Sequence, residues 1–70
     1  MTEARNYPIE IQYGNFEGEN CYRARANASE FEYLTEFADT PIDAYNLILE
    51  SIEITIKHYK EKGLEIPIPV

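Results

Sequence analysis

Only a few side chains in this sequence are of types that carry out chemistry. His58 is the single histidine and Cys21 the single cysteine among the 70 residues. A catalytic cysteine needs a base beside it, and a metal site needs several ligands at close spacing. Neither residue has such a neighbour in the sequence. We interpret Cys21 as a small buried or half-buried residue, and His58 as a structural residue that favours a helix C-terminus when protonated.

The carboxylates are numerous, but they are spread over predicted loops and solvent-facing positions. Thirteen residues are Asp or Glu, and no spacing sets two of them in one buried site, as paired acid–base catalysis requires. Gly14 and Gly18 lack the Lys-Ser/Thr pair that completes a phosphate-binding loop. The residue types therefore predict a protein that is not an enzyme and that uses no cofactor and no metal.

The overall charge narrows the classes of partner. Six Lys and Arg against thirteen Asp and Glu give a net charge of −7. Nucleic-acid binders and proteins of anionic membrane surfaces need a basic footprint, so both classes are disfavoured. The acidity fits either a basic protein partner or simple solubility. A single cysteine, no signal peptide and no run of about 18 apolar residues favour a cytoplasmic protein.

The first half of the chain predicts a hairpin. Residues 7–13 alternate and predict a half-buried strand, with its apolar face formed by Tyr7, Ile9, Ile11 and Tyr13. Residues 14–20 hold two glycines and two asparagines, which predict a loose loop or a bulge. Residues 21–27 alternate again and predict a second strand, whose alanines suit close packing by a helix.

A third strand and a long helix follow. The third strand lies within residues 31–38, and the residues leave open which of its faces meets the core. Thr40 is a good N-cap and Pro41 suits the first helical position. The helix should run from Pro41 to about Lys62, with Gly63 as the residue that ends it. Its apolar stripe is formed by Tyr45, Ile48, Leu49, Ile52, Ile56 and Tyr59.

The last residues, 64–70, alternate apolar positions with Glu65, Pro67 and Pro69, which allows an edge strand or an extended tail. The predicted class is α+β: a small, mostly antiparallel sheet of three to four strands with one long helix on one face, in the order β-β-β-α-β. Residues 1–6 are expected to fray, and residues 7–70 to form a single domain.

Two surfaces could contact another molecule. Leu47 and Ile54 fall almost opposite the helix core stripe and form a line two turns long, which suits a homodimer or a protein partner. Scattered exposed aliphatic residues are also normal on monomers. On the open face of the sheet, Glu10 could pair with Arg23 or Arg25 across strands. Alternatively, an edge strand such as residues 7–13 could accept a strand from a second chain.

The order of these motifs resembles the N-terminal domain of HicB-family antitoxins. The matching stretches are Tyr-Pro-Ile-Glu-Ile at residues 7–11, Asp-Thr-Pro-Ile-Asp-Ala at residues 39–44, and Gly-Leu-Glu-Ile-Pro-Ile-Pro at residues 63–69. The resemblance covers nearly the whole chain. It implies a partial ribonuclease H-like fold and an antitoxin that binds and masks HicA, a small basic ribonuclease toxin.

The sequence departs from that family in two places. Glu32-Tyr33-Leu34 stands where the family has Pro-Gly-Cys. The family's C-terminal DNA-binding domain has no room after Val70, so the chain alone is not expected to bind nucleic acid. The resemblance carries no catalytic residue onto this sequence.

The sequence thus predicts a non-catalytic, HicB-like protein-binding module that masks a small basic toxin. The alternative is a homo-oligomeric structural or regulatory domain with no toxin partner. In either case the candidate contact residues are Leu47, Ile54, Glu10, Arg23 and Arg25.

Overall fold

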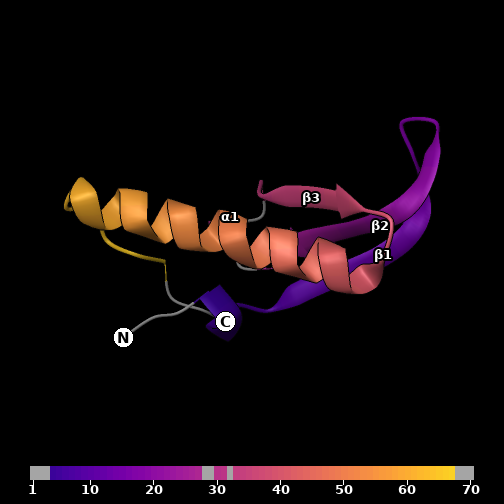
Figure 1. Cartoon of the computed structure of the whole chain (residues 1–70). Helices are drawn as coiled ribbons and strands as arrows, with labels where there is room; N and C mark the ends of the chain where they lie inside the picture. Colours follow the sequence, from indigo (N-terminus) through magenta and orange to yellow (C-terminus); the bar gives the residue numbers. More distant parts are fainter. Residues whose placement is uncertain (1–3, 28–29, 32, 68–70) are drawn as a thin grey trace.

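The computed structural model describes residues 4–27, 30–31 and 33–67. The elements follow in the order η1 (Ala4–Asn6, a 3-10 helix), β1 (Ile9–Phe16), β2 (Glu19–Ala26), β3 (Thr35–Ala38) and α1 (Pro41–Glu61). The strands form one antiparallel sheet in the order β1-β2-β3, and α1 lies across one face of it (Figure 1). This arrangement confirms the predicted α+β class and the strand–strand–strand–helix order.

The hairpin between β1 and β2 is tighter than predicted. Pairing continues to Phe16 opposite Glu19, so only Glu17 and Gly18 form the turn. Both have positive φ, +54° and +89°, as a two-residue type I′ turn requires. The expected loose loop over residues 14–20 is therefore wrong. Its glycine and asparagines remain in the ladder, where the Asn15 amide donates to the Asn20 side chain.

The register of β3 settles which of its faces meets the core. Thr35 pairs with Arg25 and Glu36 with Ala24. Paired residues of antiparallel strands point to the same side of the sheet, so Glu36 faces the helix together with the buried Ala24. Thr35 and Phe37 lie on the open face. The sequence left this choice open because both faces of the strand mix polar and apolar residues.

Helix α1 begins and ends where the sequence predicts, because its termination signals are local. The backbone N–H of Asp43 donates to the Thr40 hydroxyl at 3.2 Å. At the other end Gly63 has φ +70°, and the N–H of Leu64 donates to the Tyr59 carbonyl. At this C-terminal end, the positive φ of Gly63 and the bond from Leu64 form a Schellman motif, which satisfies carbonyls of the last turn.

The core lies between α1 and the sheet, mainly over β2 and β3. The helix contributes Ala44, Ile48, Ile52 and Ile56, and β2 contributes Ala24 and Ala26; these six are buried. The alanines allow the helix to approach β2 closely, as the sequence predicts. Phe31, just before β3, is completely buried and packs its ring against Tyr7 and Tyr59.

The apolar face of β1 is only partly buried, which corrects the prediction for residues 7–13. Tyr7 is buried and Ile9 packs on the core, whereas Ile11 and Tyr13 are 38% and 59% exposed. All of them lie on the helix-facing side of the sheet, but the helix covers the neighbouring strands. The hairpin also extends past the first turn of α1, as Figure 1 shows.

The two ends of the described chain meet beside the helix. Residues 1–6 were expected to fray; residues 4–6 form η1 with Ala4 buried, and residues 1–3 lie outside the described chain. Residues 64–67 contain no strand, so the fourth strand is absent from this part of the tail, and residues 68–70 lie outside the described chain. The tail is held by Ile66, which packs on the core, and by the Tyr7 hydroxyl, which donates to the Pro67 carbonyl.

Candidate functional site

A shallow groove lies where β3 gives way to α1. We call it the acidic groove; it has a volume of about 550 Å³ and is lined by Phe37, Ala38, Asp39, Asp43, Asn46 and Leu47. Leu47 forms its accessible apolar floor, since this side chain is 39% exposed, whereas the Phe37 ring is on the open face of the sheet and packs on Phe16. Exposed apolar groups bordered by polar residues are typical of protein-binding surfaces.

Local sequence explains why these residues come together. Only Asp39 and Thr40 separate the end of β3 from the start of α1. Because Thr40 caps the helix and Pro41 opens it, the chain turns sharply from strand to helix. This turn places Asp39 next to the first helical turn, which carries Asp43 and, one turn later, Leu47.

The groove has an uneven charge. Its described lining includes two aspartates and no lysine or arginine. The positive end of the helix dipole favours carboxylates at this position. An apolar floor with a negative rim is complementary to a partner that presents an apolar side chain among lysines or arginines.

The two helical residues singled out in the sequence are not equivalent. Leu47 lines the acidic groove. Ile54 is 62% exposed and lies two turns further along the same flank of α1, outside the groove. Both are exposed as the helical spacing predicts, but only Leu47 belongs to a hollow surface.

Of the two partners predicted for Glu10 on the open face, the structure pairs it with Arg25. Glu10 lies opposite Arg25, and their side chains form an ion pair of 3.4 Å. Gln12 lies opposite Arg23 and accepts a hydrogen bond of 2.6 Å from it. Exposed pairs of this kind contribute about 0–1 kcal/mol each, so Glu10, Arg23 and Arg25 serve mainly to hold β1 on β2.

The same face carries an aromatic cluster that the sequence does not predict. The rings of Phe16 and Phe37 lie 5.6 Å apart, and the Arg23 guanidinium sits 5.0 Å above the Phe16 ring. Cys21 shares this face of β2 and is buried, as the sequence predicts. The sequence does not predict this position of Phe16, because residues 14–20 are expected to form a loop. In β1, Phe16 points to the same side of the sheet as Gln12.

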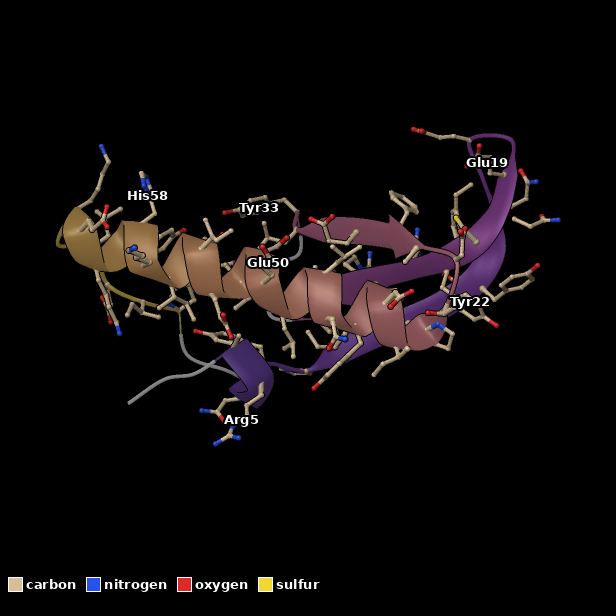
Figure 2. The ribbon with its side chains drawn as sticks, viewed as in Figure 1. Arg5, Glu19, Tyr22, Tyr33, Glu50 and His58 are labelled. Carbon is tan, nitrogen blue, oxygen red and sulfur yellow. The ribbon has the colours of Figure 1, made fainter. Side chains whose placement is uncertain are left out.

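A second groove borders η1 on the other flank of α1. It has a volume of about 580 Å³, with Ala4, Leu49 and Ile56 as apolar lining and Arg5, Glu53, Lys57 and Lys60 as charged lining. Arg5 points away from the sheet on this side (Figure 2), whereas Glu19 lies at the distant hairpin end. The sequence does not predict this groove, because residues 1–6 are expected to fray.

Two tyrosine hydroxyls have perturbed acidity. Burial raises the pKa of Tyr7, whose hydroxyl must stay protonated to donate to Pro67. Desolvation, and then the adjacent Tyr59 hydroxyl, raise the pKa of Tyr33. Both shifts keep the phenols neutral and so remove them further from use as bases.

Within the described residues, no three His, Cys, Asp or Glu side chains gather in a way that could hold a metal ion. His58 lies near the C-terminal end of α1, far along the helix from the acidic groove (Figure 2). Neither helix of the described chain combines the length and the apolarity needed to cross a lipid bilayer.

Comparisons with known proteins give no relative for this chain. No family model, no curated protein and no solved structure matches it. The resemblance to HicB-family antitoxins therefore stays a prediction.

Proposed function

We propose that this protein is a non-catalytic binding module that uses the acidic groove to hold a small basic protein. The observation that carries the proposal is the groove itself, whose lining combines the exposed Leu47 with Asp39 and Asp43. The net charge of −7 acts in the same direction, because it steers a basic partner toward the molecule before contact.

The resemblance to HicB-family antitoxins supplies the kind of partner. A HicA-like toxin is a small basic ribonuclease, and the proposed role is to cover its RNA-binding face. An apolar contact at Leu47 would anchor the complex, while the two aspartates would pair with cations on the toxin. A cytoplasmic location is part of this proposal, since such a toxin acts on cellular RNA.

The direct test is co-expression with any small basic protein encoded beside this gene, followed by purification on a tag carried by this chain. We expect a complex that weakens as salt concentration rises, and relief of any growth arrest caused by the neighbour. Failure of such a neighbour to co-purify, together with unrelieved toxicity, would contradict the proposal.

A matched pair of variants locates the contact. Leu47→Lys places a cation on the floor of the acidic groove and should weaken binding at least about tenfold, because a like charge is brought against the basic partner. Ile54→Lys makes the same change in net charge on the same helix flank but outside the groove, and should reduce affinity much less. Equal losses would show that overall charge, not the groove, determines binding.

A further inference from the structure

The outer edge of β1 is a long strand edge that the described chain leaves without a partner. The sheet order is β1-β2-β3, so β1 pairs on one side only, over eight residues. Unpaired strand edges template association unless they carry lysines, prolines or bulges. Between Ile9 and Phe16 there is no lysine and no proline, and the ladder to β2 is continuous.

The hydrogen-bond pattern identifies which residues face outward. Asn27 N–H donates to the Pro8 carbonyl, so this opposed pair is hydrogen-bonded. Antiparallel pairs alternate between hydrogen-bonded and non-hydrogen-bonded. Even-numbered residues of β1 therefore direct their backbone toward β2, and the outward amides and carbonyls belong to Ile9, Ile11, Tyr13 and Asn15.

The side chains beside this edge are apolar or neutralised. Ile11 and Tyr13 are exposed on the helix-facing side, because α1 packs mainly on β2 and β3. The single ionised residue of the strand, Glu10, is paired with Arg25. In a chain of net charge −7, this is a stretch of eight residues on which a second copy meets no uncompensated charge.

We infer that β1 pairs antiparallel with β1 of a second copy of this chain, about a twofold axis at Gln12. This register opposes Ile11 to the other copy's Tyr13 and uses all four outward-facing residues. It also sets Glu10 opposite Gly14, which keeps the two glutamates apart. Aromatic residues opposite β-branched ones are favourable cross-strand pairs. The result is a continuous six-stranded sheet in which Ile11 and Tyr13 of both copies cover one another.

The register can be tested by cross-linking. Gln12 would face its own symmetry mate in a non-hydrogen-bonded pair, with Cα atoms about 4.5 Å apart, which is within the disulfide range. Gln12→Cys in a Cys21→Ala background should therefore form a reducible dimer under mild oxidation. The matched control is Glu10→Cys in the same background, because its two copies would lie about 14 Å apart along the strands and should not cross-link. Equal cross-linking of both variants would overturn the register.

Association itself is tested by mass. Light scattering of the unmodified chain should give twice the chain mass of 8.1 kDa. Tyr13→Lys should give the single-chain mass with unchanged circular dichroism, since a lysine at the edge blocks pairing. Ile54→Lys, an equally exposed site on α1, should remain dimeric. A single-chain mass for the unmodified protein at all concentrations, or a dimer that Ile54→Lys breaks and Tyr13→Lys does not, would overturn the proposal.

Discussion

The two edges of the sheet present different surfaces to other molecules. At the β3 edge the helix lies close, and the groove there combines the apolar Leu47 with the carboxylates of Asp39 and Asp43. At the β1 edge the helix makes fewer contacts, and the strand offers eight residues of backbone with exposed Ile11 and Tyr13.

The difference follows from where one helix can lie on three strands. Since α1 packs mainly on β2 and β3, it shields one edge with side chains and leaves the other open. Side-chain chemistry selects a partner at the shielded edge, whereas backbone pairing favours another strand at the open edge. The two proposed contacts, with a basic protein and with a second copy, therefore use different edges of the sheet and do not compete.

The largest effect is expected from a substitution in the core, which unfolds the domain and so destroys both edges of the sheet. Phe31→Ala leaves a cavity among Tyr7, Tyr59 and the helix, and should lower the free energy of unfolding by about 3–5 kcal/mol. For a domain of this size that is enough to unfold much of the population. Urea denaturation followed by circular dichroism measures it. Phe37→Ala, the same change at a half-exposed ring on the open face, should cost far less, and a similar loss would disprove the central role of Phe31.

A smaller change should act on the β3 edge alone. The Ser51 hydroxyl donates to the Glu36 carboxylate at 2.6 Å in a part-buried contact between α1 and β3. Ser51→Ala removes this bond and should cost about 1–2 kcal/mol, because the carboxylate loses a charge-assisted partner. Thermal unfolding gives the cost, and Gln12→Cys cross-linking should be unaffected. Loss of the cross-link would show that the two edges are coupled.

Tyr7→Phe should destabilise the contact between the segment before β1 and the C-terminal tail. It removes the hydroxyl that donates to Pro67, at a cost of about 1 kcal/mol. Because burial raises the pKa of Tyr7 in the folded state, its contribution is complete below the unfolded value near pH 10 and is lost as the pH rises through the folded pKa. The difference in unfolding temperature between the two proteins should therefore shrink above about pH 10. A difference that grows there would contradict the assignment.

The smallest expected effect lies at the tip of the hairpin and is stabilising. Glu17 has a positive φ of +54°, a conformation that costs an ordinary L-residue about 1 kcal/mol and that asparagine tolerates better. Glu17→Asn should raise the free energy of unfolding by about 0.5 kcal/mol, because Asn-Gly is the preferred type I′ turn. Chemical denaturation measures the gain. Glu19→Asn removes the same charge at a strand position. An equal rise in its free energy of unfolding would mean that the loss of negative charge, and not the turn conformation, explains the gain.

Much of the fold and part of the site could be predicted from the sequence. Leu47 and Ile54 were recognised as exposed because helical spacing is regular, and Glu10, Arg23 and Arg25 because strand alternation is. The acidic groove as a unit was not predicted, since it needs the position of β3 against α1. The exposure of Ile11 and Tyr13 could not be predicted, because alternation reports the side of a sheet but not whether anything covers it.

The sequence by itself determined the helix and its ends, because Thr40, Pro41 and Gly63 act within one turn of their own positions. It also determined the alternation of β1 and β2 and the acidity of the whole molecule. Tertiary structure decided the parity of β3, the continuation of the hairpin through Gly14 and Asn15, and the burial of Phe31. These depend on contacts between residues distant in the chain, where register and the placement of one helix outweigh local preference.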